Sequence, residues 1–254
     1  MGKNRQKKLV ILAFEASTDY LSAALLADDS VLAMKKVKSE FGQAAKLMPL
    51  AVEVLATAQM EFSELSHVAA GCGPGSFTGI RVALATAKGV CIALTLPGLG
   101  ISGLEALAFS CAQYRHGLPI LSVADTRRDN VYFQLFDSDM TQIGKIFETQ
   151  IEKLPFLVPT SICSDGLAIT GYDWAKVEQV FAAEGIEVKS TPPPIDDFCD
   201  DQKNAGVDAV MIAKLAANKI RSGTFSPLSP LYLANPRLGT EKKRSSNDPS
   251  NEAY

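Results

Sequence analysis

VILAFEASTDYLSAALLADD at residues 10–29 and ILSVADTRRDNVYFQLFDSD at residues 120–139 follow one plan without a gap, 110 positions apart. In both copies an apolar strand ends in an acid, Glu15 or Asp125, and a turn, a second strand and an acidic hairpin turn follow. A repeat on this scale indicates one structural unit used twice. The sequence therefore predicts two tandem α/β domains of similar plan.

The segments around each copy alternate between strand and helix patterns. We expect strands at 9–14, 20–26, 31–38, 68–71, 97–101 and 167–170, and helices at 43–59, 78–94, 103–111, 173–183 and 207–221. The proline-rich and acidic segment 191–201 is expected to be a surface loop. The predicted ranges are 1–102 for the N-terminal domain, 103–235 for the second domain and 236–254 for a disordered polar tail.

Composition excludes several classes of protein. The chain has 254 residues and a net charge of -3, which creates no field for nucleic acid or an anionic membrane. Its five cysteines form no C-x-x-C pair, as expected for thiols in a reducing cytoplasm. No window reaches the ~20 apolar residues of a membrane span. We therefore expect a soluble cytoplasmic protein.

The glycine-rich stretch GCGPGSFTG at residues 71–79 connects a strand to a helix. Such a loop can bind an anion, because free backbone N–H groups and the helix dipole point at it. The stretch lacks the Lys-Ser/Thr pair of a P-loop and the third glycine of a dinucleotide fingerprint. Two interpretations stay open, a tight turn that packs helix on strand and a phosphate contact through Gly73, Gly75 and Ser76.

The helix after this loop carries only two charged residues, Arg81 and Lys88, and they lie on one side. The rest of its circumference is apolar or small, and such a helix must be covered on more than one face. Either it lies inside one domain, or one face covers the sheet and the other meets another protein. Spacing does not decide between these alternatives.

Catalytic groups are scarce. His67 and His116 form no H-x-x-x-H or H-E-x-x-H motif, and no G-x-S-x-G is present, which argues against a zinc hydrolase and a serine hydrolase. Glu15 and Asp125 at equivalent strand ends could hold a hydrated Mg²⁺ of a nucleotide, with hydroxyls from Ser17 and Thr18. Acids at strand ends are also common turn residues, so an autonomous ATPase or phosphotransferase stays an alternative.

Four stretches together resemble one bacterial family. These are ILAFEASTDYLSAALL, GCGPGSFTGIRVALATAKGVCIAL, LPGLGISGLEALA and DTRRDNVYFQLF, and the resemblance to the TsaB (YeaZ) family extends from Leu9 to about Asn235. The resemblance implies tandem duplicated actin-like ATPase domains (ASKHA, ribonuclease H-like), with mixed five-stranded sheets flanked by helices. The family's first strand usually ends in Asp, where this chain has Glu15.

What the resemblance implies about function is a non-catalytic scaffold. Such subunits take part in forming N6-threonylcarbamoyladenosine beside the anticodon of tRNA, paired with the catalytic subunit TsaD and with the ATPase TsaE, and they self-associate as homodimers in isolation. The resemblance implies no catalytic residue, no metal and no intrinsic cofactor. It implies that ATP or ADP binds only in the complex, and that the protein contacts tRNA as part of that complex. The implied partner interface is Leu47, Leu50, Val54, Phe77, Ile80, Arg81, Ala83, Leu84 and Ala87. The implied vestigial nucleotide site is Glu15, Ser17, Thr18, Gly73, Gly75, Ser76 and Asp125.

Overall fold

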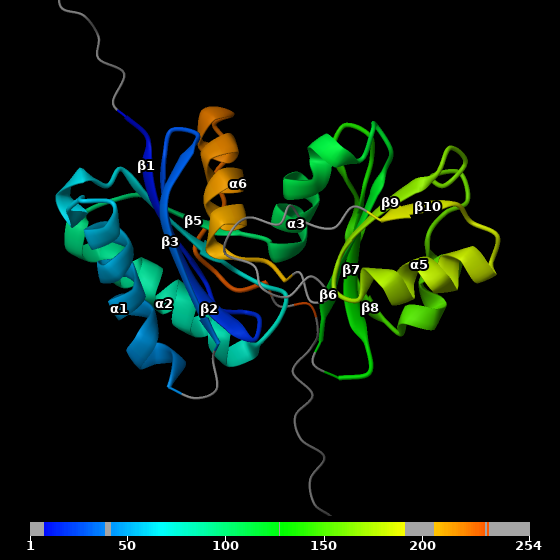
Figure 1. Ribbon diagram of the computed structural model, residues 1–254, viewed down its shortest axis with the longest axis horizontal. Coiled ribbons are helices and arrows are strands. Elements are labelled where there is room, and N and C mark those ends of the chain that lie inside the picture. Colours follow the sequence, from blue (N-terminus) through cyan, green and yellow to red (C-terminus); the bar gives the residue numbers. More distant parts are fainter. Residues whose placement is uncertain (1–7, 39–41, 127, 191–205, 232, 234–254) are drawn as a thin grey trace, which may run out of the picture.

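Two five-stranded mixed sheets form the two lobes of the protein, which a computed structural model describes over residues 8–38, 42–126, 128–190, 206–231 and 233 (Figure 1). The strand orders are β3-β2-β1-β4-β5 and β10-β9-β6-β7-β8. Read from its other edge, the second order repeats the first. This confirms the predicted α/β class and the predicted duplication.

The first sheet is built around β1, whose six residues are all buried. It pairs antiparallel with β2 and parallel with β4, so apolar side chains are needed on both of its faces. The elements of this lobe are β1 (Val10–Glu15), β2 (Tyr20–Ala27), β3 (Ser30–Lys38), α1 (Gln43–Thr57), β4 (His67–Gly71), α2 (Phe77–Leu94) and β5 (Gly98–Ile101), with a 3₁₀ turn at Phe62–Glu64.

Helices cover both faces of the first sheet. α1 and α2 pack beside each other on one face, where their apolar side chains join those of β1, β2 and β4 in one core cluster. The other face is covered by α6 (Ala209–Arg221), which follows the whole second lobe in the sequence. The chain therefore returns to its first sheet after completing the second.

The second lobe repeats this plan on a smaller scale. α5 and the short α4 pack on the outer face of its sheet, together with Phe133 and Phe181 (Figure 1). Its elements are α3 (Gly103–Cys111), β6 (Ile120–Asp125), β7 (Val131–Phe136), β8 (Gln142–Thr149), α4 (Leu154–Leu157), β9 (Leu167–Gly171), α5 (Trp174–Ala183) and β10 (Val188–Ser190), with 3₁₀ turns at Ala112–Tyr114 and Ile151–Lys153.

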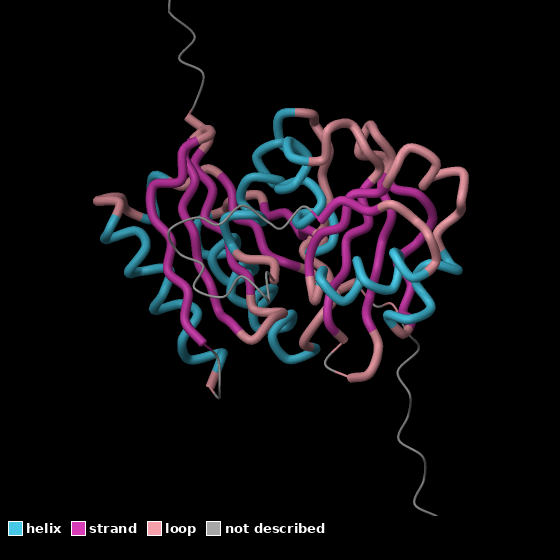
Figure 2. The backbone as a smooth tube through the Cα atoms, turned by 45° about the vertical axis from the view of Figure 1, so that its right-hand side comes forward, coloured by secondary structure: helices cyan, strands magenta, loops and turns pink. Residues whose placement is uncertain are grey.

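α3 and α6 pack against each other between the two sheets, and the sheets stay separate in the turned view (Figure 2). Glu105 of α3 and Lys219 of α6 form a half-buried ion pair at 2.7 Å. The predicted ranges 1–102 and 103–235 stay a prediction, although α6 packs on the first sheet. The expected loop at 191–201 and tail at 236–254 lie outside the described residues.

By length and composition, one helix of the described ranges could cross a membrane. It is α2, with a mean hydropathy of 1.5. Core helices of soluble proteins meet the same criterion, and one face of α2 packs against β1, β4 and β5. The packing is that of a helix covering a sheet.

Candidate functional site

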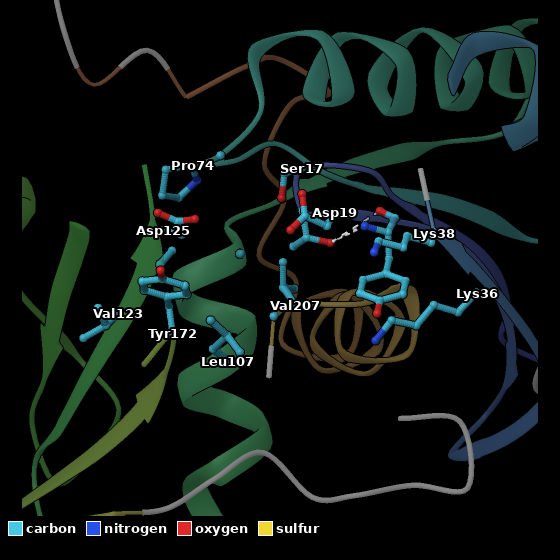
Figure 3. Close-up of a pocket in the computed structure, with 16 residues that line it drawn as sticks. Ser17, Asp19, Lys36, Lys38, Pro74, Leu107, Val123, Asp125, Tyr172 and Val207 are labelled. Carbon is cyan, nitrogen blue, oxygen red and sulfur yellow. Dashed lines mark hydrogen bonds between the residues drawn. The ribbon is translucent and has the colours of Figure 1, made fainter. Parts of the chain in front are cut away.

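A cleft between the lobes collects several of the residues that the sequence selected. It has a volume of about 280 Å³, and Figure 3 shows its lining. Ser17 and Thr18 enter from the β1–β2 turn, Gly75 from the glycine loop and Asp125 from the end of β6. The duplicated strand ends thus meet across one cavity. Other residues of the lining are Asp19, Tyr20, Lys36, Lys38, Pro74, Gly103, Leu107, Val123, Ala124, Tyr172, Gly206 and Val207.

The glycine loop is held by close backbone packing. A Cβ at Gly75 would lie 2.5 Å from the carbonyl oxygen of Ser17, and one at Gly79 would lie 1.8 Å from that of Ala16. The Ser76 hydroxyl accepts a hydrogen bond from the Gly79 N–H at 3.3 Å and caps α2, while the Gly73 carbonyl accepts from the Gly103 N–H at 2.8 Å. Gly73, Gly75 and Ser76 therefore have structural roles, as the tight-turn interpretation requires.

Glu15 lies beneath the cleft and is not part of its lining. Its carboxylate is buried, accepts a hydrogen bond from the Ser17 N–H and packs against Gly71, where a Cβ would lie 1.7 Å from Oε2. Burial raises the pKa of Glu15 to about 7, while the bonds from Ser17 lower it and buried Asp208 raises it further. Near neutral pH this group is poised between its charged and protonated forms.

The Mg²⁺–nucleotide that Glu15 and Asp125 were expected to hold does not fit these residues. Glu15 faces Gly71 and Ser17 in the interior, so its carboxylate does not meet Asp125 across the cleft. Within the described ranges, no group of three or more His, Cys, Asp and Glu side chains is placed to hold a metal ion. The two acids selected by the repeat therefore do not form a pair of metal ligands.

Sequence reasoning missed the cationic wall of the cleft. Lys36 and Lys38 come from β3, and the Lys36 ammonium lies 4.7 Å from the centre of the Tyr20 ring. In an edge strand such as β3, polar and apolar side chains alternate in the same way whether the polar side faces a cleft or open solvent. The sequence pattern therefore could not show that these lysines line a cleft. Tyr172, which follows β9, lines the opposite wall. Its position could have been inferred only from the duplicated topology.

The structure places most residues of the partner interface expected from the resemblance inside a single chain. Seven of its nine residues are buried in the core of the first lobe, where they face the sheet. Only Phe77 and Arg81 are exposed. Periodicity does not tell the inner from the outer side of α2, because the helix is apolar around most of its circumference. The buried residues are Leu47, Leu50, Val54, Ile80, Ala83, Leu84 and Ala87.

The outer face of α1 and α2 is nevertheless rich in apolar side chains. We define the α1/α2 outer face as Met48 and Val52 of α1 together with Phe77, Arg81, Ala85 and Ile92 of α2, all of them exposed. Phe77 is 59% exposed and Ile92 is 81% exposed. The Arg81 guanidinium carbon lies 3.8 Å from the centre of the Phe77 ring. Aromatic and arginine side chains of this kind are common anchors of protein interfaces.

Comparison with known proteins places this architecture in a family. The family model described as "TsaD: tRNA N6-adenosine threonylcarbamoyltransferase" matches residues 42–229. The tRNA threonylcarbamoyladenosine biosynthesis protein TsaB of Escherichia coli (strain K12) is 30% identical over 149 residues, which are 58% of this chain and 64% of that protein. TsaB of Bacillus subtilis (strain 168) is 33% identical over 129 residues, 50% of this chain and 55% of that protein. The match thus spans less than two thirds of either relative.

The solved structure of YeaZ from Pseudomonas aeruginosa has the same fold, with a TM-score of 0.67 and 24% identity over 89% of this chain and 100% of that one. Together with the two duplicated sheets, this likeness confirms the predicted actin-like ATPase fold. The family model covers most of the chain. The chain therefore belongs to this family, within its TsaB (YeaZ) branch.

Proposed function

We propose that this protein is a non-catalytic scaffold in the biosynthesis of threonylcarbamoyladenosine in tRNA. On this proposal it binds a TsaD-like catalytic subunit through the α1/α2 outer face, works with a TsaE-like ATPase in the cytoplasm and meets tRNA through the complex. A homodimer of the isolated chain would use the same face, and any ATP or ADP would be bound in the complex.

The observation that carries this proposal is the apolar character of the α1/α2 outer face. Its side chains lie on the side of α1 and α2 that points away from the sheet, so no part of the described chain covers them. Two adjacent helices offer a partner a groove between them, into which a second helix pair can pack. Exposed small residues of α2, Ala85 and Gly89, would allow a close approach.

The alternative of an autonomous ATPase has less support. It requires Glu15 and Asp125 to act together on a nucleotide, whereas the Glu15 carboxylate is buried against Gly71. A scaffold requires no such pair. A peptidase has less support for the same reason, since it needs an activated water or a nucleophile, and the sequence has neither a zinc-hydrolase nor a serine-hydrolase motif.

Introducing a negative charge on the α1/α2 outer face tests the proposal. Val52→Asp and Phe77→Asp should each weaken binding to the TsaD of the same organism at least tenfold, about 1.4 kcal/mol, because a carboxylate would be buried without a partner. Threonylcarbamoyl transfer to tRNA in a reconstituted system should fall in parallel. Both positions are exposed in the single chain, so the fold should persist.

Phe156→Asp provides the matched control. Phe156 is 70% exposed but lies on α4 of the second lobe, so this variant should bind TsaD and support modification like the wild type. Ile80→Asp is not a useful probe, because Ile80 is buried in the first lobe and the variant should unfold. Wild-type binding by both Val52→Asp and Phe77→Asp would refute the proposed interface.

A further inference from the structure

Opposite charges line opposite ends of the cleft between the lobes. Lys36 and Lys38 lie on the wall formed by β3, while Asp125 lies beside Tyr172 on the wall formed by the second lobe (Figure 3). Asp19 lies between these walls, next to Ser17. Burial raises the pKa of the Tyr172 hydroxyl most, followed by Asp125 and Asp173, with a smaller contribution from Asp19. Asp125 is therefore the acid on the Tyr172 side of the cavity, and Asp19 adds negative charge at its middle.

The floor between the charged ends is apolar. Leu107 of α3 and Val207, two residues before α6, form it, and both are buried. Such a surface favours a short carbon chain, because covering it removes apolar area from water. At about 280 Å³ the cavity is at the small end of ligand sites, which run from roughly 300 to 1,000 Å³.

The Ser17 hydroxyl adds a polar atom to this lining. It is buried and lies beside the Glu15 carboxylate, whose pKa it lowers by hydrogen bonding. A hydroxyl has one donor and two acceptor lone pairs, so Ser17 can also contact a ligand in the cleft. A hydroxyl can donate to a carboxylate or accept from an ammonium group, so it suits either end of a zwitterion.

We propose that this cleft binds a small zwitterion, a primary amine joined by a short carbon chain to a carboxylate. The amine lies toward Asp125 and Asp19, the carboxylate toward Lys36 and Lys38, and the chain over Leu107 and Val207. Among the described residues, no carboxylate lies within ion-pair distance of either lysine, and the Lys36 ammonium lies over the Tyr20 ring.

Other small ligands fit this lining less well. A polyphosphate would bring several negative charges toward Asp19 and Asp125, and the described residues place no cluster of metal ligands to offset them. A diamine would be repelled at the lysine end, and a dicarboxylate at the acid end. The balance of two acids and two lysines favours a ligand that carries one charge of each sign.

Calorimetry and ligand-observed NMR on the full chain test this proposal. The probes are 4-aminobutyrate, 5-aminopentanoate and 6-aminohexanoate, compared with butylamine, butyrate and Mg·ATP. At least one amino acid should bind tenfold or more tightly than butylamine and butyrate. Asp125→Asn and Lys36→Gln should each weaken this binding about tenfold, and Ser17→Ala by a smaller factor.

The matched controls keep the chemical changes but move them to exposed sites of the second lobe. Asp165→Asn and Lys145→Gln should leave binding unchanged. Circular dichroism checks that every variant is folded. The proposal is overturned if none of the three amino acids binds, if Mg·ATP binds more tightly than all of them, or if Asp125→Asn and Lys36→Gln both bind like the wild type. It stands independently of the proposed scaffold role, since the isolated chain is tested and the α1/α2 outer face is not altered.

Discussion

Glu15 shows how a residue can match a motif in sequence and differ from it in role. It ends β1 as Asp125 ends β6, which made the two acids look equivalent. The side chain of Glu15 is one methylene longer than Asp, and it reaches Gly71 and the Ser17 N–H in the interior instead of the cleft. The sequence predicted the position of the acid but not the direction of its side chain.

Replacing Glu15 should change how stability depends on pH. The pKa of about 7 in the fold lies above the ordinary value of 4.5, so the folded state binds the extra proton. Stability is therefore full below about pH 4.5 and falls as pH rises through 7, by up to about 3 kcal/mol. Glu15→Gln should remove this loss, and its free energy of unfolding relative to wild type should increase from pH 5 to pH 8 in urea titrations.

Glu184 is exposed, so Glu184→Gln serves as the control for this prediction. Its free energy of unfolding should differ from that of the wild type by less than about 0.5 kcal/mol at either pH. The prediction is contradicted if the free energy of unfolding of Glu15→Gln differs from that of the wild type by the same amount at pH 5 and at pH 8. The buried carboxylate would then not limit stability at alkaline pH.

At the scale of elements, the sequence predicted α2 well but not its orientation. The bounds of the helix differ by one residue from those expected, because Ser76 caps it as a serine at this position should. Its inner face could not be assigned, since Ile80 and Ile92 are equally apolar although one is buried and the other is 81% exposed. Only the packing against β4 and α1 distinguishes them.

Two glycines of α2 should respond in opposite ways to alanine. Gly79→Ala places a Cβ 1.8 Å from the Ala16 carbonyl oxygen, a backbone atom that cannot move aside cheaply, and should destabilise the protein by about 2 kcal/mol or more. Gly89→Ala has no neighbour within 4 Å and should stabilise it by about 0.5–1 kcal/mol. Chemical unfolding of both variants measures the difference, and equal effects would contradict the close packing of α2 on the β1–β2 turn.

At the scale of the whole molecule, the sequence pattern did not predict that the chain returns to its first sheet after the second lobe. The repeat predicted two similar sheets, and the structure has them. The last helix, however, could have covered either sheet, because its apolar stripe fits both. Its position is set by contacts made after the second lobe, such as the Ser22 hydroxyl that accepts from the Ala209 N–H at 3.0 Å.

The first lobe should therefore not fold without α6. A fragment of residues 1–102 would expose the face of the first sheet that α6 covers, including Ile11, Ala13 and Leu26. The free-energy cost of exposing this apolar face to water is larger than the small net stability of a domain of this size.

A fusion protein tests this prediction. Gly103 and Val207 are neighbours, since a Cβ at Gly103 would lie 3.3 Å from Val207 Cγ1. A short glycine–serine linker can therefore join residues 1–102 to residues 206–233. This fusion should regain a cooperative thermal transition that the fragment lacks. If the fragment alone melted cooperatively as a soluble monomer, the first lobe would be an independent unit and α6 an accessory to it.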